Sequence, residues 1–160
     1  MDKPVFGTEL PNWAEVVSAY VSVATVFALI FAGVQVTFLN RQIHRELESL
    51  YLQRYWAVMD RRSGRFSAGG RPSRADKYVI HAYLQLSNDQ LGLRSVGRVT
   101  DHTWRFWARD ISAQCRTVAY VNELKSASLD DYTKVRALLS SGETYDPLQR
   151  TRAWRILRGL

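Results

Sequence analysis

An uncharged, apolar stretch from Val16 to Asn40 constrains this chain more than any other feature of its sequence. An α-helix needs about 20 apolar residues to cross a hydrocarbon layer ~30 Å thick, and this stretch is long enough to do so. Because lipid offers no partners for backbone amides, a helix is the conformation expected there. We therefore predict a transmembrane helix over residues 13–40, preceded by an external N-terminal tail over residues 1–12.

The charges on either side of this stretch predict its orientation. The first fifteen residues hold one lysine and three carboxylates, a net charge of −2, which leaves +9 for the remainder of a chain whose total is +7. Arg41 and Arg45 follow the apolar stretch at once, and positively charged flanks stay in the cytoplasm. An acidic N-terminus and so long an apolar stretch argue against a cleaved signal peptide. We expect a single-pass protein of the inner (cytoplasmic) membrane, with the N-terminus outside and the C-terminal domain in the cytoplasm.

One face of the predicted span repeats small or polar residues at alternating spacings of three and four. Small residues let two helices approach closely in lipid, and a glutamine can hydrogen-bond across such an interface. This pattern predicts that the span associates with itself or with another membrane protein. The alternative is that such residues are merely common in transmembrane helices. The predicted association face consists of Ser18, Val21, Thr25, Ala28, Ala32 and Gln35.

The rest of the chain predicts an all-α fold, in which the N-terminal helix extends into the cytoplasm and a small domain of about three to four helices follows. Helical periodicity continues through a juxtamembrane helix over residues 41–62. Glycine, serine and proline mark a basic loop over residues 63–75. The helical domain is expected over residues 76–145, and a basic amphipathic C-terminal helix over residues 146–160.

Local signals predict where the helices of this domain begin and end. Thr100 suits the N-cap of a helix from Asp101 to about Lys125. Ser128 with Asp131 resembles a capping box and predicts the start of another helix. Gly142 is expected to end that helix as its C-cap.

A polar line on the first helix of the domain has two interpretations. His81, Gln85 and Asn88 follow one another at i, i+4 and i+7. Such a line forms either a solvated face with side-chain hydrogen bonds or a row of ligand contacts.

Arginines dominate the positive charge of the predicted cytoplasmic part. The last helix is expected to open at Asp146-Pro147 and combines arginines with Trp154, a composition that suits the anionic inner leaflet. The alternative is that this tail docks on the domain. The arginines predicted to contact lipid or another anion are Arg41, Arg45, Arg61, Arg62, Arg105, Arg109, Arg116, Arg150, Arg152, Arg155 and Arg158.

The sequence contains no pattern typical of a catalytic or metal site. Cys115 is the lone cysteine, which excludes an intrachain disulfide and cysteine-based zinc sites. The three histidines lie far apart and outside any metal-binding motif, and no phosphate-binding glycine loop is present. We therefore predict a protein that is not an enzyme, with no catalytic residues, no metal and no cofactor.

Two segments resemble an uncharacterised bacterial family of small single-span membrane proteins with a cytoplasmic helical domain. They are RYWAVMDRRSGRF, over residues 54–66, and KYVIHAYLQLSNDQLGLRSVGRVTDHTWRFWARDI, over residues 77–111. The resemblance covers roughly Val16 to Ala119 and is most specific from Gly97 to Trp107. It implies the architecture described above and no assigned activity.

These features together predict a membrane-anchored, non-enzymatic interaction protein, a subunit or an adaptor. Its expected partners are the anionic lipids of the inner leaflet and, through the span, a second copy or another membrane protein. We do not expect nucleic acid to be a partner, because the positive charge already has an explanation in orientation and lipid contact. The alternatives are a membrane-tethered nucleic-acid-binding or regulatory protein, and a membrane factor of prophage or host defence.

Overall fold

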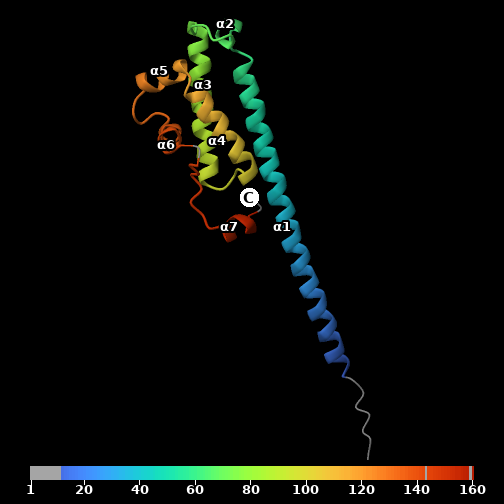
Figure 1. Cartoon of the computed structure of the whole chain (residues 1–160). Helices are drawn as coiled ribbons and strands as arrows, with labels where there is room; N and C mark the ends of the chain where they lie inside the picture. Colours follow the sequence, from blue (N-terminus) through green and yellow to red (C-terminus); the bar gives the residue numbers. More distant parts are fainter. Residues whose placement is uncertain (1–11, 143, 159) are drawn as a thin grey trace, which may run out of the picture. The chain divides into compact units, whose positions relative to one another are not determined.

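The computed structural model describes residues 12–142, 144–158 and 160, and the fold of these residues is all-α (Figure 1). The chain divides into two units, the first ending at Leu39 and the second running from Asn40 to Leu160. The described part of the chain contains no strand and seven helices: α1 (Trp13–Met59), α2 (Gly64–Ser67), α3 (Arg74–Ser95), α4 (Asp101–Cys115), α5 (Val118–Ser126), α6 (Thr133–Ser141) and α7 (Arg152–Leu157).

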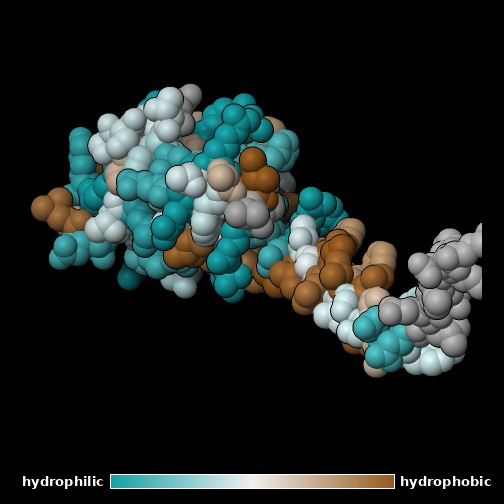
Figure 2. Space-filling view, turned by 90° about the horizontal axis from the view of Figure 1, so that it is seen from below, coloured by the Kyte–Doolittle hydropathy of each residue, from teal (hydrophilic) through white to brown (hydrophobic). Residues whose placement is uncertain are grey.

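The first unit is the N-terminal part of α1, which is long and apolar enough to cross a membrane. Its most apolar window has a mean hydropathy of 2.1 and no buried residue. Large side chains such as Phe27 and Leu29 are each 68 % exposed, and the surface of this unit is largely hydrophobic (Figure 2). Thr25 and Thr37 donate their hydroxyl hydrogens to carbonyls four residues earlier, so the helix satisfies these polar groups by itself. The predicted external tail lies outside the described residues up to position 11.

The part of α1 that belongs to the second unit has one buried side. It buries His44 and Tyr51 and packs Tyr55 against the domain core. The prediction of one helix from the span to about residue 60 is confirmed, because α1 continues unbroken to Met59. Ile43 and Leu50 are 40 % and 43 % exposed, because the buried side of the helix follows His44 and Tyr51.

Helix α3 forms the centre of the second unit and contacts α4, α5 and α6. Leu84 and Leu91 of α3 are fully buried, as is Tyr120 of α5. Trp104 of α4 and Leu138 of α6 complete the same cluster. Burial of a large apolar side chain contributes about 1.5–3 kcal/mol, so this cluster supplies the main driving force for folding of the second unit.

The predicted basic loop is closed by a single buried carboxylate. Asp76 accepts hydrogen bonds from the backbone amides of Ser63 and Ser73 and from both serine hydroxyls, at 2.6–2.9 Å. These hydrogen bonds lower the pKa of Asp76 well below its ordinary value. The loop also contains the single turn of α2, which its glycine and serine content did not predict.

The predicted helix from Asp101 to Lys125 is wrong in its length, because α4 ends at Cys115 and α5 begins at Val118. Thr117 takes an extended conformation between them, with φ −70° and ψ 148°. Its hydroxyl donates to the carbonyl of Gln114 at 2.8 Å, which satisfies a group that the end of α4 would otherwise leave free. The predicted N-cap at Thr100 is confirmed, since its hydroxyl accepts from the amide of Thr103.

The helix start predicted at Ser128 is wrong, because α6 begins at Thr133. Tyr132 precedes it in a left-handed conformation with φ 54°, and its own side chain caps nothing. The cap comes from another helix, where Asn88 Oδ1 accepts from the amide of Lys134 at 3.1 Å. The Tyr132 hydroxyl lies 2.5 Å from His81 Nδ1, so two members of the predicted polar line hold α6 in place.

Of the two remaining predicted helix boundaries, the end of α6 is confirmed and the start of the C-terminal helix is wrong. Gly142 ends α6 with φ 83°, as predicted. The C-terminal helix does not open at Asp146-Pro147, because the Asp146 side chain accepts from the amide of Leu148 in a turn. Helix α7 begins at Arg152, with Thr151 as its N-cap.

The remote cap predicts a stability effect for Asn88. Asn88→Ala should lower the free energy of unfolding of the full-length protein in mild detergent by about 1 kcal/mol, because the first turn of α6 loses its acceptor. Urea denaturation followed by circular dichroism measures the difference. Gln85→Ala, on the same helix and exposed, is the matched control and should change it by less than about 0.5 kcal/mol. Equal effects of the two substitutions would contradict the capping role.

Candidate functional site

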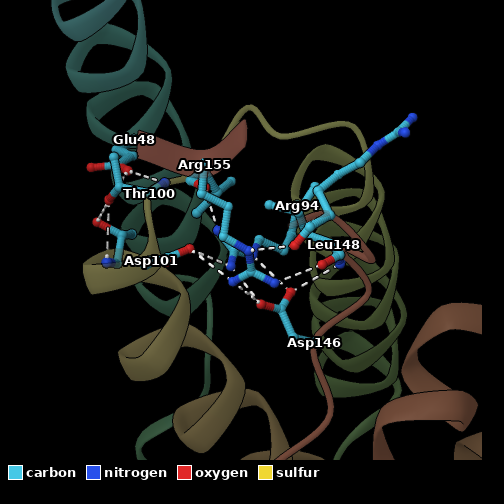
Figure 3. Close-up of polar contacts among 10 residues, drawn as sticks. Glu48, Arg94, Thr100, Asp101, Asp146, Leu148 and Arg155 are labelled. Carbon is cyan, nitrogen blue, oxygen red and sulfur yellow. Dashed lines mark hydrogen bonds and ion pairs between the residues drawn. The ribbon is translucent and has the colours of Figure 1, made fainter. Parts of the chain in front are cut away.

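The guanidinium of Arg94, near the end of α3, lies buried between two carboxylates. Its side chain is 1 % exposed. Nε and Nη2 donate to the two oxygens of Asp146 at 2.8 and 2.5 Å, a bidentate pair. Nη2 also donates to Asp101 at 2.5 Å, and Nη1 donates to the carbonyl of Val99 at 2.8 Å. Every nitrogen of this buried cation therefore has an acceptor (Figure 3).

Arg155 of α7 is the second cation of the same network. Its Nη1 lies 2.9 Å from Asp146 and 3.2 Å from Asp101, and its Nη2 donates to the carbonyl of Leu148 at 2.7 Å. Two arginines thus share two carboxylates, which balances the buried charge. We call Arg94, Asp101, Asp146 and Arg155 the charge network.

The network raises the pKa of the buried Arg94 and lowers the pKa of the half-buried Asp146. Burial alone would lower the pKa of Arg94, but hydrogen bonds and attraction from Asp146 and Asp101 outweigh it and raise the value. Burial would likewise raise the pKa of Asp146, but the hydrogen bond from Arg94, the amide of Leu148 and the charge of Arg155 lower it. Each group is therefore held in its charged form.

Helix α1 is attached to the same end of the second unit by two polar contacts. Glu48 accepts from the amide of Thr100 at 3.1 Å and from its hydroxyl at 2.8 Å (Figure 3). His44 Nδ1 lies 3.0 Å from the carbonyl of Arg98. The segment between α3 and α4 is therefore fixed to α1 on one side and to the charge network on the other.

A basic, tryptophan-bearing surface lies where α7 packs against this segment. Trp154 sits over Gly97, where a Cβ atom would come within 2.9 Å of the indole and where φ is +71°, so glycine is required. The guanidinium groups of Arg150 and Arg158 lie 5.6 and 5.2 Å from the centre of the Trp154 ring. Arg152 is exposed beside them. The lower face of the second unit, which includes this region, is mainly hydrophilic in Figure 2. We call Arg150, Arg152, Trp154 and Arg158 the α7 surface.

The structure distributes the arginines predicted to contact anions over several surfaces rather than one. Arg62 is half-buried at the start of the basic loop, where its guanidinium covers the ring of Phe66. Arg155 is occupied by the charge network. The others are exposed: Arg41 and Arg45 on α1, Arg61 after it, Arg105, Arg109 and Arg116 at α4, and Arg150, Arg152 and Arg158 at the α7 surface.

The predicted association face of the span is exposed in the first unit. This holds for all six residues, Ser18, Val21, Thr25, Ala28, Ala32 and Gln35. The hydroxyl of Thr25 is already bonded to the carbonyl of Val21, so Ser18 and Gln35 are the polar side chains of this face that are available to a second helix.

Sequence reasoning missed Arg94, the most important charged residue of the domain. Nothing in its neighbourhood distinguishes it from a surface arginine, and its partner Asp146 lies 52 positions away. Asp101 and Asp146 attracted attention solely as residues at helix starts. The bidentate partner of Arg94 is so far along the chain that the pairing leaves no local signal in the sequence.

The described residues include no group of three or more His, Cys, Asp or Glu side chains arranged to hold a metal ion. Cys115 is fully buried in the core, and burial raises the pKa of its thiol to about 12. The thiol is therefore protonated, and so poorly nucleophilic, at neutral pH.

Comparison with known proteins identifies no relative. No family model, no curated protein and no solved structure matches the chain. The resemblance of residues 54–66 and 77–111 to a family of single-span proteins therefore stays a prediction.

The charge network predicts a large effect of removing one carboxylate. Asp146→Asn should lower the free energy of unfolding by roughly 2–3 kcal/mol, because two arginines lose a charged acceptor and one of them is buried. Urea denaturation of the full-length protein in detergent measures this. The control is Asp110→Asn, whose exposed pair with Arg109 spans 3.7 Å and should contribute less than about 0.5 kcal/mol.

The difference in the free energy of unfolding between wild type and Asp146→Asn depends on pH. Because the fold lowers the pKa of Asp146, its contribution is complete above the ordinary aspartate value of about 3.9 and is lost as the pH falls below it. The difference between wild type and Asp146→Asn should thus stay constant from pH 7 to about pH 5 and shrink in stronger acid. A difference that vanishes near pH 6 would contradict the assignment.

Proposed function

We propose that this chain is a membrane-anchored interaction protein, in which α1 spans the inner membrane and the second unit presents basic surfaces in the cytoplasm. The observation that carries the proposal is the exposed part of α1 after Glu15, which has no charged side chain as far as Asn40 and continues directly into a folded basic unit. An apolar helix exposed on every side is stable in lipid and unfavourable in water. The arginines after Asn40 support a cytoplasmic position for the second unit.

The α7 surface is the part of the second unit best suited to lipid. The chain enters this unit at Asn40, and the contact between His44 and the carbonyl of Arg98 brings the α3–α4 segment to the same end. Trp154 packs on Gly97 of that segment. The α7 surface therefore belongs to the end of the second unit at which the chain enters it from the first unit. Each arginine close to an anionic leaflet contributes about 1 kcal/mol, and tryptophan favours the interface.

Lipid contact predicts protection of α7 that depends on lipid charge. In nanodiscs with phosphatidylglycerol, backbone amides of residues 152–158 should exchange hydrogen more slowly than in phosphatidylcholine nanodiscs, because the arginines hold α7 at the anionic surface. Hydrogen exchange with mass spectrometry measures this. Arg152→Gln with Arg158→Gln should abolish the difference between lipids, whereas Arg105→Gln with Arg109→Gln, an equal loss of charge on α4, should preserve it. Exchange that is identical in the two lipids would refute the contact.

We also propose that the span associates with a second transmembrane helix through the association face. Its small side chains permit close backbone approach, and Gln35 supplies a hydrogen bond that lipid cannot. A second copy of the chain or the span of another membrane protein fits this face equally.

Association predicts a defined complex on extraction in mild detergent. Native mass spectrometry of the full-length protein should show either a homo-oligomer or a stable assembly with another membrane protein. Ala28→Leu with Ala32→Leu should disrupt it, because larger side chains separate the helices. Val26→Leu with Ile30→Leu, at the same depth on the opposite side of α1, is the control and should leave it intact. A monomer in the wild-type protein would rule out the association face.

A further inference from the structure

A groove of about 970 Å³ lies at the other end of the second unit, where the basic loop meets α5. Its walls come from the loop around Gly69 and Pro72, from the first turns of α3, from the end of α4 and from α5 along its whole length. Figure 1 shows α2 and α5 at the same end of α3. The volume is within the range of small-molecule sites, about 300–1,000 Å³.

Positive charge without a partner lines this groove. Arg62, Arg71 and Lys77 contribute three cations, and Glu123 is the single carboxylate among the lining residues. Within the part of the chain that the structure describes, none of the three cations forms an ion pair. The Nε atom of Arg62 is shielded from solvent and has no hydrogen-bond acceptor. A partly buried arginine usually has a carboxylate or another anion beside it. Arg62 lacks such a partner for its Nε atom.

The first turn of α5 adds to the positive potential. Thr117, Val118 and Ala119 line the groove, and the Thr117 side chain makes no capping bond to the helix, because its hydroxyl donates to Gln114. Free amides at a helix start carry partial positive charge and favour anions, phosphate groups above all.

An apolar wall accompanies the cations. Phe66 and Ile80 form the inner side of the groove, and both are buried. Val118, which is 76 % exposed, stands at its edge. A ligand that uses the whole groove therefore combines an anionic group with an apolar or aromatic part.

We propose that this groove binds a soluble organic phosphate of nucleotide size or smaller, with its phosphate on Arg62, Arg71, Lys77 and the start of α5. The apolar wall receives the remainder of the ligand. A lipid headgroup carries the same phosphate chemistry, but α1 rises roughly 28 Å between Asn40 and Met59, so the groove lies far from the point where the chain leaves the membrane. A soluble source is therefore favoured. The proposal does not depend on the lipid contact of α7.

Isothermal titration calorimetry of the full-length protein in an uncharged detergent tests the site, with ATP and inorganic pyrophosphate as probes. Saturable binding of one probe molecule per chain is expected. Arg71→Gln with Lys77→Gln should weaken it by about tenfold or more, because two charge-assisted contacts are lost. Arg105→Gln with Arg109→Gln removes the same charge from α4 and should leave the dissociation constant within about twofold.

A second pair of variants separates loss of binding from loss of fold. Val118→Glu places a carboxylate in the first turn of α5, where it stabilises the helix but repels an anion in the groove. It should abolish binding without lowering the stability of the protein, whereas Val118→Gln should retain binding. Absence of saturable binding, equal weakening by the α4 control, or binding confined to phosphatidylglycerol nanodiscs would each overturn the proposal.

Discussion

The buried guanidinium of Arg94 is the interaction on which the architecture of the second unit depends. A charge removed from water is tolerated only where it is paired and hydrogen-bonded, and here each nitrogen has an acceptor. Those acceptors come from the segment between α3 and α4, from the start of α4 and from the turn before α7. Satisfying one side chain therefore ties the start of α4 and the distant turn before α7 to the end of α3, and Arg155 extends the same constraint to α7.

This constraint explains why a six-residue helix can be ordered at all. Isolated helices shorter than about 12–15 residues are marginal in water, so α7 needs tertiary contacts to form. Arg155 in the charge network and Trp154 on Gly97 supply them. The remaining arginines of α7 are left free of carboxylates among the described residues, and this division gives the C-terminal segment both a fixed position and an exposed positive face.

Sequence reasoning worked where the signal was local and failed where it was distant. The unbroken α1, the cap at Thr100 and the end of α6 at Gly142 followed from composition or from a single residue. The start of α6 did not, because its cap is Asn88, more than forty positions earlier. The charge network and the groove could not be predicted either, because each is formed by residues that are far apart in the sequence. Arginines that look alike in sequence divide into buried, half-buried and exposed residues once the helices pack.

If α1 spans the membrane as proposed, its start and α7 lie in opposite compartments, and cysteine labelling tests this most directly. Cys115 is fully buried, so the native thiol should stay silent in the folded protein. Asn12→Cys should react with a membrane-impermeant maleimide on intact spheroplasts. Arg152→Cys should react with it only after the membrane has been permeabilised. Labelling of both positions on the same side of the membrane, or the reverse pattern, would contradict the account.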